Sequence, residues 1–181
     1  EYLDALSGIE AAVDFATQIP HGPLRAYVMR DRCYADATGE DLSRMAALTK
    51  DAINAGALGF STSRTLLHKG SDGVHVPGTF APTEELHAIA AGMAEAKSRA
   101  VFQMTSNHVD MPKELSWMTR VARELRLPVS FNLLQTDPAP ELYRDMLGAL
   151  DRLVAEGLPI RAQVAGRPAG VLMCWEGTAN P

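Results

Sequence analysis

Short apolar segments alternate along this chain with longer segments whose apolar residues recur every three or four positions. The helix-like segments cover residues 40–56, 83–100, 112–127 and 140–157. The strand-like segments cover residues 12–19, 57–62, 100–105, 128–134 and 159–165. Because a helical segment separates each pair of successive strands, this order predicts βαβ units and a parallel sheet.

The ends of these helices carry recognisable signals. Thr83 precedes two acidic residues and is expected to be an N-cap, and Pro112 suits the first turn of its helix. Gly56 and Gly157 are expected to end the helices that they follow.

Two architectures accommodate such units: an open doubly wound sheet and a (β/α)₈ barrel. An open dinucleotide-binding sheet needs a glycine-rich turn after its first strand, and the sequence contains no G-x-G-x-x-G. The α/β fold class predicted here is therefore a parallel (β/α) barrel of TIM type, present as a partial barrel of about five βα units. Residues 1–181 are expected to form a single segment of it.

Composition limits the classes of partner and compartment. The 181 residues are 46% hydrophobic, enough for one core, and the formal net charge of −5 argues against nucleic acid and membrane as partners. Two distant cysteines, Cys33 and Cys174, predict no disulfide framework and favour the cytoplasm. The abrupt start at Glu1 and abrupt end indicate a piece of a longer protein.

Each predicted strand has an apolar face and a partly polar face, because side chains alternate along a strand. The polar faces carry one group per strand near the carboxyl end: Gln18, Ser61, Gln103, Asn132 and Gln163. These groups either bond to one another and to water, or hold a substrate by hydrogen bonds. The second interpretation makes them a pocket floor, with Thr62, Gln135 and Arg167 as further substrate-binding residues.

Three residues are the strongest catalytic candidates. His21 follows the first predicted strand and serves either as an acid, base or ligand at the pocket mouth or as part of a turn. Ser61 and Arg64 end the next strand, where a guanidinium suits a substrate carboxylate. The alternative is that Ser61 and Thr62 cap the turn while Arg64 pairs with a loop acid. His108 is a candidate for a replacement role, and His68 and His75 are more typical of a solvated loop.

The run "AGALGFSTSRTLLH", with "PHGPLRAYVM" before it and "VPGTFAPTEEL" after it, resembles the N-acyl-D-amino-acid deacylase (D-aminoacylase) branch of the amidohydrolase superfamily. The resemblance covers nearly the whole chain. It implies that the segment supplies about the third to seventh strands of the parent barrel.

The resemblance also implies zinc-assisted amide hydrolysis, with histidine ligands at the ends of the fifth and sixth strands. The family patterns T-H-M-R and S-H-L-K align with "FQMT" and "FNLL", which places Gln103 and Asn132 at those histidines. An amide is a poor zinc ligand, so no metal-binding residue is predicted in this chain.

The expected parent is therefore a hydrolase of the amide bond of N-acyl-D-amino acids or related compounds, and the isolated segment is expected to be inactive. The alternative is a metal-free, non-catalytic barrel that binds a small molecule. An acyl amino acid or similar compound is the expected ligand. The open edges of a partial barrel predict a homo-oligomer.

Overall fold

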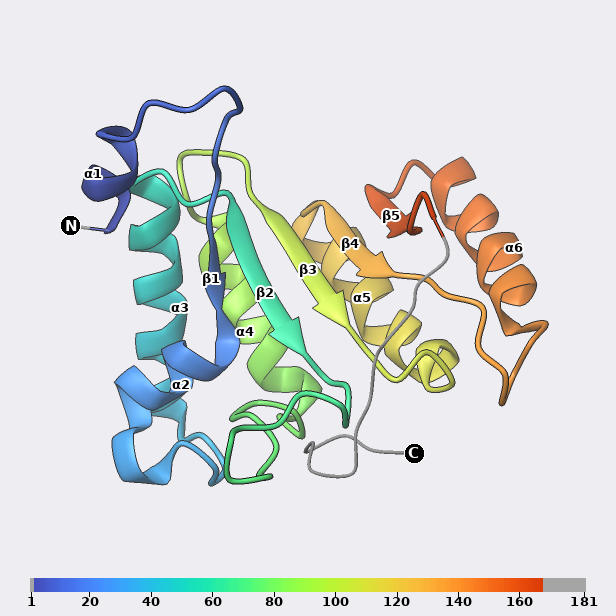
Figure 1. The fold of residues 1–181 in the computed structure, drawn as a ribbon, viewed down its shortest axis with the longest axis horizontal. Helices are drawn as coiled ribbons and strands as arrows, with labels where there is room; N and C mark the ends of the chain where they lie inside the picture. The colour runs from blue at the N-terminus through green and yellow to red at the C-terminus, as the bar shows by residue number, and fades with distance from the viewer. Residues whose placement is uncertain (1, 168–181) are drawn as a thin grey trace.

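A parallel sheet forms the centre of the computed structural model, which describes residues 2–167 (Figure 1). Its strands follow the order β1-β2-β3-β4-β5, and every neighbouring pair is parallel. They are β1 (Gln18–Pro20), β2 (Gly59–Ser63), β3 (Val101–Thr105), β4 (Val129–Asn132) and β5 (Ile160–Gln163). Sequential order with helical crossovers is the arrangement of a partial (β/α) barrel, so the predicted fold class is confirmed.

Helices cover one face of this sheet (Figure 1). The crossover between β1 and β2 contains α2 (His21–Met29), the short 3₁₀ helix η1 (Arg30–Arg32) and α3 (Gly39–Asn54). The later crossovers are α4 (Thr83–Ala94), α5 (Met111–Leu125) and α6 (Leu142–Ala155), and a short helix, α1 (Tyr2–Ser7), precedes the sheet. No helix within residues 2–167 covers the opposite face, here called the inner face.

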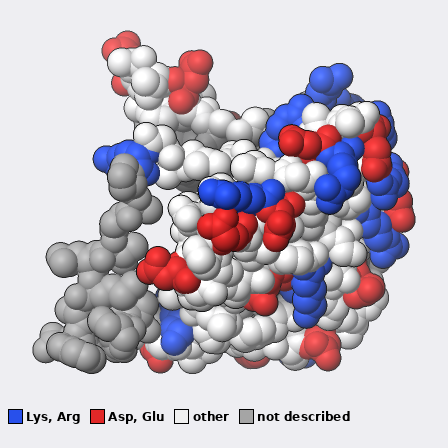
Figure 2. Space-filling model, turned by 90° about the vertical axis from the view of Figure 1, so that its right-hand side faces the viewer, with Lys and Arg blue, Asp and Glu red and all other residues white. Residues whose placement is uncertain are grey.

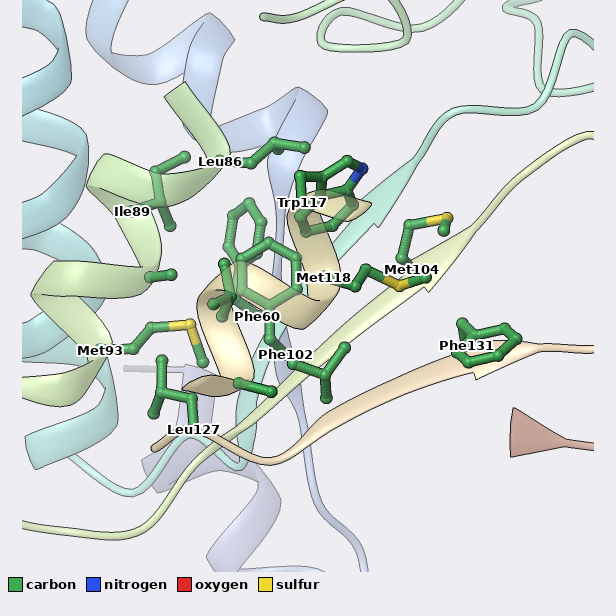
Figure 3. Packing of buried hydrophobic residues seen from close by; sticks show 14 of the residues in the cluster. Phe60, Leu86, Ile89, Met93, Phe102, Met104, Trp117, Met118, Leu127 and Phe131 are labelled. Carbon is green, nitrogen blue, oxygen red and sulfur yellow. The ribbon is translucent and has the colours of Figure 1, made fainter. Parts of the chain in front are cut away.

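The core lies between the helices and the sheet. Phe60, Phe102 and Phe131 project from β2, β3 and β4 and are fully buried, as are Met104 and Met118 (Figure 3). Burying one such side chain contributes about 1.5–3 kcal/mol. Since these residues alternate with polar ones along the strands, the predicted division into an apolar and a polar face is confirmed for β2, β3 and β4.

The first strand differs from its prediction. It spans Gln18–Pro20, whereas the segment predicted as a strand begins at residue 12. Val13 and Phe15 are 69% and 56% exposed and pack under no helix. Ladder pairing to β2 begins near Leu58, whose amide donates to the carbonyl of Thr17, so the residues before Thr17 have no ladder partner in β2.

Two helix predictions also need correction. The α2 helix, missed in the sequence, begins directly at His21 and accommodates Pro23 in its first turn, where proline sacrifices no helical hydrogen bond. Pro82, rather than Thr83, is the N-cap of α4. The predicted glycine stops are confirmed, because Gly56 and Gly157 follow α3 and α6 with φ of 111° and 79°.

The amino end of α3 is closed by a capping box. Thr38 accepts from the amide of Asp41, and the Asp41 carboxylate accepts in return from the Thr38 amide at 2.9 Å. Arg32 also donates to this carboxylate at 2.8 Å. The hydrogen bonds from Arg32 and Thr38 lower the pKa of Asp41 to about 2.

Asp41 should therefore contribute to acid stability in a defined pH window. Its pKa is lower in the folded chain than the usual 3.8, so its contribution is complete above pH 3.8 and is lost toward pH 2. We expect Asp41→Asn to be less stable than the parent near neutrality, with the difference shrinking across that window. Urea unfolding at a series of pH values measures this. The neighbouring exposed Glu40→Gln is the control, and equal pH profiles for both variants would contradict the role of Asp41.

The surface over α6 and β5 carries basic and acidic side chains side by side (Figure 2). Exposed pairs such as Arg123–Glu156 and Arg144–Glu141 contribute to this mixture. Both edge strands, β1 and β5, pair on one side only within residues 2–167, and association through them stays a prediction. None of the described helices has the length and apolar character needed to cross a membrane.

Candidate functional site

Polar side chains form two rows across the inner face near the carboxyl ends of the strands. Strand register places Ser61 beside Gln103, and Gln103 beside Ser130. In the next row Ser63 lies beside Thr105, whose hydroxyl donates to Asn132 Oδ1 at 3.2 Å. The first row therefore collects groups from three strands that are distant in sequence, which is where barrel enzymes carry their sites.

A pocket of about 350 Å³ lies between β1, β2, β3 and the loop that follows β2. We call it the strand-end pocket. Five of the predicted site residues line it: Gln18, His21, Ser61, Thr62 and Gln103. Ser63, His68 and Thr105 line it as well. Gln18 departs from its prediction in one respect, since it is the first residue of its strand rather than near the carboxyl end.

The remaining predicted residues lie elsewhere on the same sheet. Gln135 and Arg167 line a separate, mostly apolar hollow of about 490 Å³ beyond β4 and β5, together with Tyr143. Asn132 and Gln163 are in register with each other between the two hollows. The single pocket floor predicted from the sequence is therefore divided.

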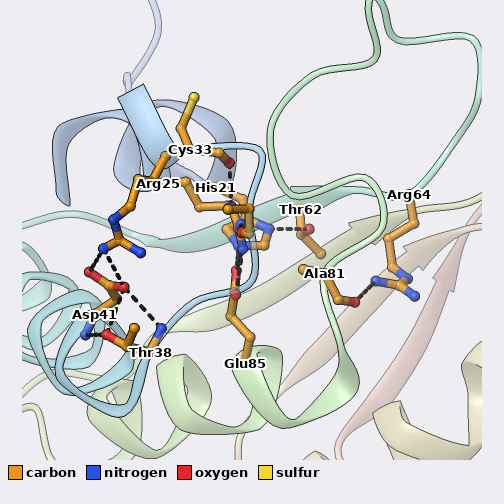
Figure 4. A network of polar contacts seen from close by, with 11 residues as sticks. His21, Arg25, Cys33, Thr38, Asp41, Thr62, Arg64, Ala81 and Glu85 are labelled. Atoms are coloured by element: carbon orange, nitrogen blue, oxygen red, sulfur yellow. Dashed lines mark hydrogen bonds and ion pairs between the residues drawn. The ribbon is translucent and has the colours of Figure 1, made fainter. Parts of the chain in front are cut away.

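His21 is buried in a polar network rather than placed at a pocket mouth (Figure 4). Its Nδ1 lies 2.8 Å from Thr62 Oγ1, and its Nε2 lies 2.7 Å from Glu85 Oε1. Arg25 donates to the same carboxylate at 2.5 Å and to the carbonyl of Cys33 at 2.9 Å. Gly78 packs against the imidazole so closely that a Cβ there would lie 2.6 Å from Nδ1.

The electrostatics of this network favour a neutral imidazole. Burial is the main cause that holds the pKa of His21 below its usual value, although Glu85 opposes it. Burial alone would raise the pKa of Glu85, but hydrogen bonds from His21 and Arg25 lower it. The neutral ring then donates from Nε2 to Glu85 and accepts at Nδ1 from Thr62. Both ring nitrogens already have protein partners. This geometry therefore supports the alternative in which His21 has a structural role rather than that of an acid, base or ligand.

Arg64 lines neither hollow. Its Nε lies 2.9 Å from Glu114 Oε2, its Nη1 donates to the carbonyl of Ala81 at 2.7 Å, and its side chain is 13% exposed. This geometry supports the alternative in which Arg64 pairs with an acid, although the acid belongs to α5 and not to a loop. A substrate role for Arg64 stays a prediction.

Two further histidines lie near the strand ends. His108 follows β3 in a left-handed conformation with φ of 62°, which is strained for this residue type. Burial lowers its pKa, and the carbonyl of Asn132 opposes that shift. The loop after β2 brings His68 back to the end of that strand, where its Nδ1 lies 2.5 Å from Ser63 Oγ. No spacing in the sequence indicated that contact, because a loop turn creates it.

The donor set does not suit a zinc ion. Within residues 2–167 no three His, Cys, Asp or Glu side chains are grouped so that they could hold a metal. Gln103 and Asn132 place amide side chains on the inner face. Amides suit zinc poorly, because zinc prefers imidazole, thiolate or carboxylate ligands. The side chains within residues 2–167 therefore do not fit the metal that the family resemblance implies.

Comparison with known proteins gives a consistent set of relatives. No protein-family model matches the chain. D-aminoacylase from Alcaligenes xylosoxydans xylosoxydans is 32% identical over 129 residues, which is 71% of this chain and 25% of that protein. The chain thus spans about a quarter of the length of this curated relative.

Two solved structures share the fold. N-acyl-D-glutamate deacylase from Bordetella bronchiseptica, complexed with zinc and a phosphonate mimic of the tetrahedral intermediate, matches 92% of this chain and 34% of its own, with a TM-score of 0.77 and 23% identity. A D-aminoacylase described as defining a novel subset of amidohydrolases matches 90% of this chain and 32% of its own, with a TM-score of 0.70 and 24% identity.

Proposed function

Because this chain is a D-aminoacylase-like segment, we propose that its strand-end pocket binds the acyl amide of an N-acyl-D-amino acid and belongs to a protein that hydrolyses this bond. The observation that carries the proposal is the convergence of Gln18, Ser61 and Gln103 on one pocket of about 350 Å³. The 32% identity to a D-aminoacylase supports the choice of substrate class.

The chemistry of the pocket suits an amide ligand. Gln18 and Gln103 each offer a carbonyl acceptor and two N–H donors, and Ser61 offers a hydroxyl that donates and accepts. A substrate amide has one donor and one acceptor, so it can satisfy these side chains without an ionic partner. Arg167 is exposed and lines the separate hollow, so its role as a partner for a substrate carboxylate stays a prediction.

A metal-free binder is the second candidate, and the donor set favours it for this chain. We place Gln103 and Asn132 at the positions where the family's histidine ligands would stand. Since the described residues offer no zinc site, we expect the 181-residue chain to bind the amide without measurable amide hydrolysis.

Calorimetry with N-acetyl-D-glutamate tests the binding. We expect saturable binding to the full chain, weaker binding of the L-enantiomer, and an affinity about five- to tenfold lower in Gln103→Ala, as the loss of one hydrogen bond implies. Ser116→Ala, at an exposed position on α5, should bind as the parent does. No saturable heat, or equal binding by Gln103→Ala, would contradict the assignment of the pocket.

Elemental analysis of zinc content tests whether Gln103 and Asn132 stand in place of the family's histidine ligands. We expect the purified chain to contain no stoichiometric zinc after equilibration with the metal, because amide oxygens compete poorly for it. The double variant Gln103→His, Asn132→His restores two imidazoles on neighbouring strands and should retain zinc. Stoichiometric zinc in the unaltered chain would contradict the placement of Gln103 and Asn132 at the family's histidine positions, and with it the metal-free candidate.

A further inference from the structure

A hydroxyl and an imidazole meet at the rim of the strand-end pocket. Ser63 Oγ lies 2.5 Å from His68 Nδ1, within hydrogen-bonding distance, and both residues line the pocket. Ser63 is half-buried and His68 is exposed, so a ligand in the pocket can reach both side chains. This differs from the contact between Thr62 and His21, where both partners are at most 5% exposed.

Strand and loop geometry fix the two residues in place. Ser63 is the last residue of β2 and lies in register with Thr105 of β3 on the inner face. The amide of Val76 donates to the carbonyl of His68, and Lys69 pairs with His75 as an isolated antiparallel bridge. This narrow turn folds the loop back on itself and holds His68 against the strand end.

We propose that Ser63 and His68 form a nucleophile–base dyad that accepts an acyl group from an ester. In the tautomer that carries its proton on Nε2, His68 accepts at Nδ1 from the Ser63 hydroxyl, which is the geometry in which an imidazole activates a serine. Ser63 Oγ attacks the acyl carbon, its proton passes to Nδ1, and the carbonyl electron pair moves onto the carbonyl oxygen. Collapse of this intermediate breaks the bond to the leaving alcohol, which takes the proton from Nδ1 and leaves an ester on Ser63.

Water then completes the cycle. His68 Nδ1 removes a proton from a water molecule as that water attacks the acyl-serine, and Ser63 leaves with the proton returned. The carboxylic acid product departs. The side-chain amide of Gln103, which lines the same pocket, is the proposed donor to the developing oxyanion in both steps.

The surroundings of His68 set the expected reactivity. No carboxylate among residues 2–167 pairs with this imidazole, and losing the orienting acid of a serine triad lowers kcat by about 10⁴-fold. The dyad should therefore react with activated esters and only very slowly with amides. This inference goes beyond the proposed function, which assigns only amide binding to the side chains of this chain, but it uses the same pocket.

The test is acylation of the full chain by p-nitrophenyl acetate. We expect a burst of about one p-nitrophenolate per chain. Intact mass should rise by one acetyl group, and peptide mapping should place that group on Ser63. Ser63→Ala should abolish the modification at this peptide, and His68→Asn should slow the burst about a hundredfold or more. Ser63→Cys supplies a second nucleophile at the same place and should retain rapid acetylation.

Ser43→Ala and His87→Asn are the matched controls, because both residues lie on helices away from the pocket and should leave the burst unchanged. Circular dichroism confirms that each variant is folded. Absence of acetyl-Ser63, or an undiminished burst in either dyad variant, would overturn the proposal. Loss of N-acetyl-D-glutamate binding with intact acetylation would instead count against the proposed function, so the two failures are distinguishable.

Discussion

Replacing Glu85 with alanine is expected to lower the free energy of unfolding by about 3–5 kcal/mol, as removal of one partner from a buried ion pair does. Glu85 is 2% exposed and accepts hydrogen bonds from both Arg25 and His21. Without it, the guanidinium of Arg25 stays buried with carbonyl partners but no counter-charge. Guanidinium unfolding monitored by circular dichroism measures the change.

Glu95 provides the matched control, because it caps the same helix at its exposed end. It pairs with Lys50 at 2.9 Å, and its side chain is 67% exposed. Exposed pairs of this kind contribute little, so Glu95→Ala should leave the unfolding midpoint nearly unchanged. Similar midpoints for the two variants would show that the buried network does not stabilise the fold.

Substituting Gly92 with alanine is expected to destabilise the chain by about 1–3 kcal/mol or more, the usual cost of overpacking. Gly92 lies in α4 where that helix crosses α3, and an added Cβ would lie 2.3 Å from the carbonyl oxygen of Ala46. The obstacle is helix backbone, so it cannot be relieved by moving a flexible side chain. The clash therefore exceeds the helix-propensity gain of about 1 kcal/mol that alanine brings.

At Gly148 the same substitution to alanine is expected to change the free energy of unfolding in the opposite direction. It lies within α6, and an added Cβ there would meet only Arg152 Nη1 at 3.9 Å. Gly148→Ala should thus stabilise the chain by up to about 1 kcal/mol, through helix propensity alone. Thermal and urea unfolding of both variants checks the pair. If both variants shifted the unfolding midpoint equally and in the same direction, close packing of α4 against α3 would not be the reason for glycine at position 92.

The parallel α/β class and the division of strand faces could be read from the sequence because both depend on local periodicity. Within the five residues of β3, Phe102 and Met104 alternate with Val101, Gln103 and Thr105. The structure buries the first two and leaves the other three half-buried on the inner face. The same reasoning failed at Val13 and Phe15, whose pattern resembles a strand. A strand also needs a partner in a ladder, and periodicity does not supply one.

The candidate site was only partly predictable, because a site depends on which strand ends meet. Sequence reasoning found Gln18, Ser61 and Gln103, and the structure places them in one pocket. It also grouped Gln135 and Arg167 with them, but they line a separate hollow. The sequence placed His21 at the pocket mouth, yet it is buried and bonded to Glu85, 64 residues further along the chain.

The sequence by itself determined the parallel α/β architecture and the glycine stops at Gly56 and Gly157. These are properties of residue type and short-range spacing. Tertiary structure alone decided that His21 and Arg25 share Glu85, and that His68 reaches Ser63. Such contacts depend on helix docking and on the path of a loop, which residue type and spacing do not specify.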